Sequence, residues 1–120
     1  MKKEIDIQLN EVTLKANLSQ PADANGLVIF AHGSGSSRLS PRNNFVAAVL
    51  NRQHLATLLV DLLTPPEDEV YENRFDILLL SKRLIKVTEW ALTQTSLQQL
   101  PVGYFGARTP PLSFQLKPRF

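Results

Sequence analysis

The chain has 120 residues, a length that suits one domain with a buried core. It has no cysteine, which excludes a disulfide framework, a thiolate metal site and a cysteine nucleophile, and which agrees with a cytoplasmic protein. The net charge of +2 is unevenly placed, because residues 1–107 hold eleven acidic and ten basic side chains whereas residues 108–120 hold three basic ones and no acid. The body therefore lacks the basic stripe typical of nucleic-acid binding, and no apolar run is long enough for a secretory signal or a membrane span.

The first two predicted elements are strands. Residues 4–9 and residues 12–18 alternate between apolar and polar side chains, and a period of two is typical of a strand with one buried face. The two-residue link Asn10-Glu11 predicts that these strands form an antiparallel hairpin.

Three further strands alternate with two predicted helices. The continuous apolar runs at 27–31 and 55–60, and the shorter run at 102–105, are typical of strands buried on both faces of a parallel sheet. Ser40-Pro41 is expected to begin the first helix, with serine as N-cap, and residues 73–95 are expected to form the second. The order predicts an α/β fold, in which an antiparallel hairpin precedes three parallel strands joined by two crossover helices.

Apolar side chains at helical spacing identify the faces of the two helices that we expect to be buried. They are Phe45, Val46, Val49 and Leu50 in the first helix, and Ile77, Leu80, Leu84, Val87 and Ala91 in the second. The charged side chains of the second helix, Arg83 among them, are expected to lie away from the core.

A glycine-rich loop, His32-Gly33-Ser34-Gly35, follows the first of the buried strands. Ligands of open α/β sheets bind at the carboxyl ends of the parallel strands, so this loop is a candidate site. Three interpretations remain open. The Ser34 backbone N–H is a candidate for an oxyanion hole; the loop with Ser36, Ser37 and Arg38 is a candidate phosphate cradle; and the segment is also compatible with an ordinary turn.

Three segments, taken in order, resemble the dienelactone-hydrolase-like branch of the α/β-hydrolases: VIFAHGSGSSRLSPRNNFVAAVL, LATLLVDLLTPPED and RFDILLLSKRLIKVTEW. The resemblance runs over residues 4–107. It implies the N-terminal half of an α/β-hydrolase fold and a family activity on small esters, lactones or related acyl substrates, with no cofactor. In such a fold the loop at His32, Gly33 and Gly35 would supply one oxyanion-hole N–H.

After the last predicted strand, the resemblance implies a nucleophile elbow of the form G-x-S-x-G. The chain has Gly106-Ala107-Arg108-Thr109-Pro110, so Gly106 and Ala107 are an elbow remnant and Arg108 occupies the serine position. A guanidinium stays protonated and cannot attack a carbonyl, and proline has no N–H and a fixed φ. The Thr109 N–H is the second oxyanion-hole candidate. Neither an acid nor a histidine follows residue 107, so the catalytic triad is absent and we expect the chain to be inactive as written.

The remaining polar residues of interest are interpreted as structural. Asp61 ends a strand and is expected to be structural or adjacent to substrate, whereas Glu67–Glu69 are expected to form a solvated loop. His54 is expected to cap the first helix, and neither His54 nor His32 is a credible general base. We expect no metal site.

The composition changes abruptly at residue 108. Three of the eight prolines lie in residues 108–120 together with the basic excess. This favours a division into the N-terminal half of a hydrolase domain at 1–107 and an atypical proline-rich basic tail at 108–120, with truncation by a frameshift as the hypothesis. The alternative is a non-enzymatic module that binds an anion, a phosphate or a partner through residues 32–38. An unpaired sheet edge after the last strand also predicts self-association.

Overall fold

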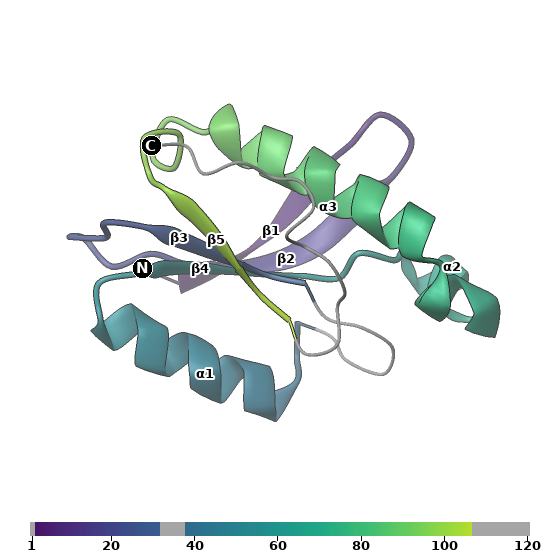
Figure 1. Cartoon of the computed structure of the whole chain (residues 1–120), viewed down its shortest axis with the longest axis horizontal. Coiled ribbons are helices and arrows are strands. Elements are labelled where there is room, and N and C mark those ends of the chain that lie inside the picture. Colours follow the sequence, from purple (N-terminus) through teal and green to yellow (C-terminus); the bar gives the residue numbers. More distant parts are fainter. Residues whose placement is uncertain (1, 32–37, 107–120) are drawn as a thin grey trace.

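The computed structural model describes residues 2–31 and 38–106, which form one mixed sheet covered by a helix on each face (Figure 1). In this part of the chain the sheet has five strands in the order β1-β2-β4-β3-β5. The strands are β1 (Lys2–Gln8), β2 (Thr13–Ser19), β3 (Leu27–Phe30), β4 (Ala56–Val60) and β5 (Val102–Phe105). The helices are α1 (Pro41–Arg52), the short α2 (Pro65–Asp68), the 3-10 helix η1 (Tyr71–Phe75) and α3 (Ile77–Leu92). The predicted α/β class and element order are confirmed.

The hairpin of β1 and β2 is antiparallel, as predicted. Its apolar side chains, which alternate with polar ones, lie on the face that packs on the core. Ile7 lies opposite Leu14 in the register, and both side chains are buried. The other edge of β2 pairs antiparallel with β4, where Leu18 lies opposite Leu58. The hairpin is therefore joined to the parallel strands through β2 alone.

The parallel part of the sheet has β3 at its centre, between β4 and β5. All five residues of β4 are buried, which confirms the prediction from its continuous apolar run. The prediction is wrong for β5, whose side chains alternate between partly buried and exposed. Within residues 2–31 and 38–106 no strand pairs with the outer edge of β5, so one of its two sides lacks the neighbour that full burial needs.

Helix α1 begins where the sequence predicted. The Ser40 Oγ accepts a hydrogen bond from the Asn43 N–H at 3.2 Å, and Pro41 is the first helical residue. The expected buried face is partly wrong, since Phe45 is 68% exposed while the smaller Ala47 is buried. The helix contacts the sheet through a narrow strip that reaches Val46 and Leu50 but leaves Phe45 outside it.

The C-terminal end of α1 closes with a left-handed residue, His54, at φ 68°. Its N–H donates to the Asn51 carbonyl at 3.2 Å, and the Leu55 N–H donates to the Leu50 carbonyl at 3.1 Å. These two bonds are the Schellman pattern, which usually has glycine at the left-handed position. His54 therefore closes this helix, as expected.

Helix α3 is shorter than the predicted span of 73–95. The Asp76 carboxylate accepts the Leu79 N–H at 3.0 Å and caps the helix, so the chain before it forms η1 instead of a first helical turn. Leu84, Val87 and Ala91 are buried as expected, whereas Ile77 in the first turn is exposed. Among the described residues, no helix has the length and apolar character needed to cross a membrane.

The candidate site at the carboxyl edge of the sheet

The three parallel strands end at one edge of the sheet, where two of them are joined directly after their last residues. The Ala31 N–H donates to the Phe105 carbonyl at 2.9 Å, and the ring centroids of Phe30 and Phe105 are 5.0 Å apart. The chain after β3 and the chain after β5 therefore start from neighbouring points. This is the edge at which open α/β sheets bind their ligands.

Most of the residues predicted to form a site lie outside the described residues. They are His32, Gly33, Ser34, Gly35, Ser36 and Ser37 in the first loop, and Ala107, Arg108, Thr109 and Pro110 in the elbow segment. Gly106 is described, and it directly follows β5. The oxyanion-hole and elbow assignments therefore stay predictions.

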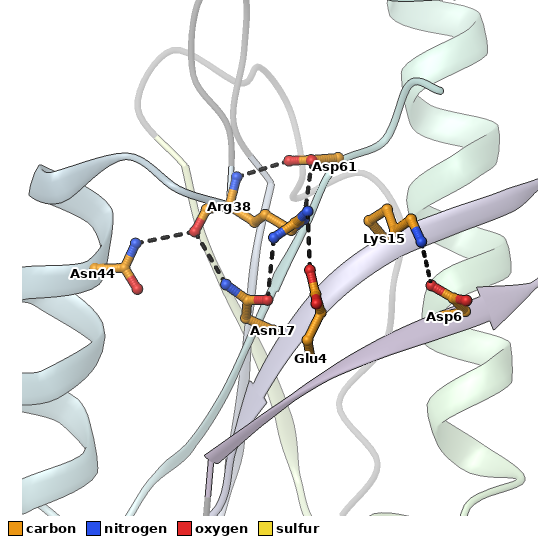
Figure 2. Close-up of polar contacts among 7 residues, drawn as sticks. All are labelled: Glu4, Asp6, Lys15, Asn17, Arg38, Asn44 and Asp61. Carbon is orange, nitrogen blue, oxygen red and sulfur yellow. Dashed lines mark hydrogen bonds and ion pairs between the residues drawn. The ribbon is translucent and has the colours of Figure 1, made fainter. Parts of the chain in front are cut away.

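Arg38, the first described residue after that loop, lies in a cluster of polar side chains from β1, β2, α1 and the residue directly after β4 (Figure 2). Its guanidinium Nη2 lies 3.1 Å from Glu4 Oε2 on β1, and Nη1 donates to Asn17 Oδ1 on β2 at 3.4 Å. Its Nε lies 3.2 Å from Asp61 Oδ2 as an ion-pair contact that lacks hydrogen-bond geometry. Only 14% of the Arg38 side chain is exposed, and burial of a charge at this level requires such partners.

The backbone of Arg38 is held by the same cluster. The Arg38 N–H donates to Asp61 Oδ1 at 2.7 Å, so one carboxylate contacts both the backbone and the side chain of one residue. The Arg38 carbonyl accepts from Asn44 Nδ2 at 3.0 Å and from Asn17 Nδ2 at 3.5 Å. Asp61 therefore has a structural role at this edge, which is one of the two roles expected for it.

These contacts bear on the phosphate-cradle interpretation. That interpretation needs the Arg38 guanidinium to face a bound anion, but two carboxylates already lie against it. Arg38, Glu4 and Asp61 together carry a net charge of −1, which repels an anion. The sequence missed this pairing because its members come from distant parts of the chain.

In the loop after β4, Asp68 and Glu69 are exposed as the sequence predicted, whereas Glu67 is not a solvated side chain. Glu67 and Thr64 form a capping box for α2, in which Glu67 Oε1 accepts the Thr64 N–H at 2.9 Å. Glu67 also accepts two hydrogen bonds from Arg83, at 2.9 Å from Nη1 and 2.7 Å from Nη2. The Arg83 Nη1 donates further to the Leu62 carbonyl at 2.9 Å, so this charged side chain lies against the loop after β4 with 11% of its surface exposed.

The pairing with Arg83 sets the ionisation of Glu67. The hydrogen bonds from Arg83 lower the pKa of Glu67 from 4.5 to about 2, against the opposing effect of partial burial. The Thr-x-x-Glu spacing at residues 64–67 is the sequence signal that could have predicted the cap. No local pattern indicates the partner at position 83.

His54, the one histidine that the structure describes, lies away from this edge. Its Nδ1 is 2.6 Å from Asp23 Oδ2, and its carbonyl accepts the Asn25 N–H just before β3 begins. His54 is thus at the amino end of the parallel strands, where it cannot serve a reaction at their carboxyl end. Within the described ranges, no three His, Asp or Glu side chains gather in a way that could hold a metal ion.

Comparison with solved structures places this arrangement among known folds. The crystal structure of dienelactone hydrolase from Anabaena variabilis ATCC 29413 is 50% identical to this chain and superposes with a TM-score of 0.85. The match covers 89% of this chain and 51% of that one. The chain has a partial α/β-hydrolase fold, similar to about half of that dienelactone hydrolase.

Two more distant structures share this hydrolase fold. Est1E from Butyrivibrio proteoclasticus has a TM-score of 0.69 at 18% identity, over 86% of this chain and 39% of Est1E. A cold-adapted esterase from an Arctic intertidal metagenomic library has a TM-score of 0.68 at 13% identity, over 88% of this chain and 49% of the esterase. At these identities the likeness concerns the fold alone.

Curated relatives carry a different name. Two Mycobacterium tuberculosis proteins, from strains CDC 1551 / Oshkosh and ATCC 25618 / H37Rv, are named "Putative phosphoribosyl transferase" and are 51% identical to this hydrolase-fold chain over 107 residues. The match covers 89% of this chain, which spans about a quarter (24%) of the length of those relatives. No family model matches the chain.

Proposed function

We propose that this chain is half of a serine-type acyl hydrolase for small esters or lactones, and that as written it has no such activity of its own. The observation that carries the proposal is the 50% identity to a dienelactone hydrolase over 89% of the chain. The convergence of the ends of β3 and β5 on one point of the sheet edge supports it further, because nucleophile and oxyanion donors must meet at such a point.

In the proposed chemistry, a serine after β5 attacks the carbonyl carbon of the substrate, and two backbone N–H groups stabilise the negative charge that develops on the carbonyl oxygen. The donors are the N–H of Ser34 and the N–H of Thr109. Arg108 stands where the serine belongs, and it can neither attack a carbonyl nor be activated by a base. Residues 108–120 contain neither an acid nor a histidine, so they supply no further member of a triad.

We also propose that a change of reading frame separates residues 1–107 from residues 108–120. The abrupt change in composition at residue 108 supports this proposal, and the curated relatives match 107 of the 120 residues. The nucleotide sequence through codon 107 and beyond tests this proposal. A second frame that continues with Ser at the elbow and later supplies an acid and a histidine is the expected result, and noise in every frame would refute it.

Turnover of an activated ester such as p-nitrophenyl acetate tests the inactivity of the chain. We expect only the background rate, and the same rate after Arg108→Ser, because a serine without its base stays protonated. A frame-restored protein with the complete triad should exceed that background by several orders of magnitude. Turnover by the unaltered chain, or none by the frame-restored protein, would contradict the proposal.

The second candidate function is a module that binds a phosphate or another anion through residues 32–38 without turnover. The relatives' name favours it, since a phosphoribosyl group carries phosphate. The pairing of Arg38 with Glu4 and Asp61 opposes it. A rise in the melting temperature of the chain with inorganic phosphate, but not with chloride at equal ionic strength, would favour this candidate over the first.

We further infer that the chain associates with itself through the outer edge of β5, since free N–H and C=O groups on a strand edge pair with other chains. Gly103 offers a site for a test, because a Cβ there meets no atom within 4 Å. We expect Gly103→Lys to shift the sedimentation profile toward monomer, whereas Phe45→Lys on the exposed side of α1 should leave it unchanged. A monomeric unaltered chain at all concentrations would refute this inference.

A further inference from the structure

The segment between β4 and α3 carries most of the large apolar side chains that the described part of the molecule exposes. Five of these eight side chains lie in η1 or within two residues of it: Val70, Tyr71, Phe75, Ile77 and Leu78. The ring centroids of Tyr71 and Phe75 are 5.1 Å apart. We call these five side chains the η1 patch. Soluble proteins rarely expose large apolar side chains side by side, and such a patch with polar groups around it usually marks an interaction site.

The η1 patch contributes little to the core. Neither apolar cluster of the described residues includes any of its five side chains. Figure 1 shows α2 beyond the end of the sheet, beside the first turn of α3. Packing on the sheet therefore does not explain why apolar side chains occupy these positions.

Hydrogen bonds nevertheless hold the segment that carries the patch. The Glu67 carboxylate caps α2 and also accepts two hydrogen bonds from Arg83 on α3. The Glu67 carbonyl accepts from Asn73 Nδ2 at 2.9 Å, and Arg74 Nε donates to the Asp68 carbonyl at 3.0 Å. The patch is thus presented from a backbone that is tied at several points. A surface that is already ordered loses less conformational entropy when it binds a partner.

Acidic side chains surround the η1 patch. Residues 64–78 hold five acidic side chains and one basic one, whereas the rest of residues 1–107 holds six acidic and nine basic ones. Two of the five acids are paired with an arginine. The other three are exposed and form no ion pair with a described residue; they are Glu69, Glu72 and Asp76. A partner that complements this surface must therefore bring basic groups together with apolar ones.

We propose that the η1 patch binds a basic, amphipathic segment of another protein. Apolar side chains of that segment pack on the rings of Tyr71 and Phe75, and its lysine or arginine side chains lie against Glu69, Glu72 and Asp76. A second copy of this chain that presented the same surface would bring two acidic patches together, which opposes a symmetric dimer at this place. The proposal does not depend on acyl hydrolysis.

The fluorescence anisotropy of a labelled synthetic peptide, titrated with the full chain, tests the proposal. The peptide has leucine and lysine at helical spacing, and a matched peptide has glutamate in place of lysine. We expect the lysine peptide to bind and the glutamate peptide to bind at least about tenfold more weakly, because its charges repel the acids of the patch. Added salt should weaken binding of the lysine peptide.

Phe75→Ser should raise the Kd of the lysine peptide about tenfold or more, since a central aromatic anchor is lost. Phe45→Ser is the matched control, because that ring is also exposed but lies on α1, and it should change the Kd less than twofold. Both side chains are more than half exposed, so neither change should lower the melting temperature by more than about 4 °C.

Glu72→Gln should raise the same Kd about twofold to fivefold and make binding less sensitive to salt, since a charge at the rim is removed. Glu89→Gln is its control. That acid is also exposed, but it lies in the C-terminal half of α3 and should have no measurable effect on binding.

Equal binding of the two peptides, or equal Kd values for Phe75→Ser and Phe45→Ser, would overturn the proposal. A full chain that does not bind the lysine peptide would overturn it as well. So would a shift of the chain alone toward monomer in sedimentation after Phe75→Ser, because the occupant of the patch would then be a second copy of this chain.

Discussion

Helices α3 and α1 cover opposite faces of the same sheet (Figure 1). The side chains beneath the two helices differ in kind. Under α3 lies the large apolar cluster, which includes Ile7, Leu58, Leu84 and Val87. Under α1 lies a small cluster of Phe30, Ala47 and Leu59, bordered by hydrogen-bonded polar side chains. The difference indicates that the α3 face supplies most of the apolar burial, whereas the α1 face depends more on hydrogen bonds between side chains.

The polar side of this comparison is built around Asn51. Its Nδ2 donates to the Leu55 carbonyl at 2.9 Å and to Thr57 Oγ1 at 3.2 Å, and its Oδ1 accepts from Ser19 Oγ at 2.9 Å. Apolar side chains can repack around a changed neighbour at little cost. A buried polar group that loses its hydrogen-bond partner has no such compensation. Four substitutions test how far the two faces differ.

Leu84→Ala should have the largest effect, since it opens a cavity in the cluster beneath α3. We expect a loss of about 2–5 kcal/mol in the free energy of unfolding. Urea unfolding followed by the fluorescence of Trp90, the single tryptophan, measures it. Leu78→Ala on the same helix is the control, because that side chain is mostly exposed and should cost less than about 0.5 kcal/mol. Equal costs would show that α3 packs less tightly than the structure indicates.

Asn51→Ala should cost about 1–3 kcal/mol, because Thr57 and the Leu55 carbonyl lose a donor at a place with little access to water. The same urea measurement applies. Asn43→Ala, in the first turn of α1, should be nearly neutral. If Asn51→Ala lowers the free energy of unfolding more than Leu84→Ala does, the α1 face contributes more to stability than the α3 face, contrary to our expectation.

Glu67→Gln should cost about 1–2 kcal/mol at pH 7, a value reduced for the solvent that reaches the Glu67 side chain. The pKa of Glu67 is lowered to about 2 in the folded chain, so its contribution is fully present above pH 4.5 and is lost as the pH falls toward 2. Urea unfolding at pH 7 and pH 3 should therefore show a smaller difference between parent and variant at pH 3.

Asp68→Asn is the matched control for that measurement, because it weakens the neighbouring but exposed pair with Arg74 (3.2 Å). Its effect should stay below about 0.5 kcal/mol at both pH values. A Glu67→Gln effect that does not depend on pH would mean that the lost charge is not what matters.

His54→Gly should have the smallest effect and the opposite sign, with a gain of about 0.5–1 kcal/mol. Glycine adopts φ 68° without the steric cost that a Cβ brings, and the exposed contact with Asp23 that is lost contributes little. Gln53→Gly, one residue earlier at φ −98°, should instead destabilise the chain. A loss of stability in His54→Gly would show that the Asp23 contact outweighs the strain.

The sequence predicted those parts of the molecule that depend on local patterns. The alternation in the hairpin and the cap at Ser40-Pro41 depend only on neighbouring residues. The structure therefore has both where the sequence predicted them. The predicted start of α3 at residue 73 was wrong because Asp76 caps the helix and so begins it at Ile77. The predicted burial of Phe45 was wrong because helical spacing identifies the face of a helix that packs on the sheet. It does not show how wide a strip of that face the sheet covers.

The candidate site was less predictable, because its described contacts join distant segments. Asp61 and Arg38 are 23 residues apart, Arg38 and Asn17 are 21 apart, and Arg83 and Glu67 are 16 apart. Their pairing depends on the sheet order, which brings strand ends together only after folding. Because sequence reasoning does not reveal these partners, it left a phosphate contact for Arg38 open as one of three interpretations and assigned Glu67 to solvent.

The sheet order also has a consequence for synthesis on the ribosome. The central strand β3 is made early, yet both of its partners come later, with β4 beginning at residue 56 and β5 at residue 102. At translation rates of about 5–20 residues per second, the apolar segment of β3 waits several seconds for its last partner. During that interval, residues 27–30 are exposed unless a chaperone at the exit of the ribosomal tunnel covers them. The yield of folded chain should therefore depend on the speed of elongation.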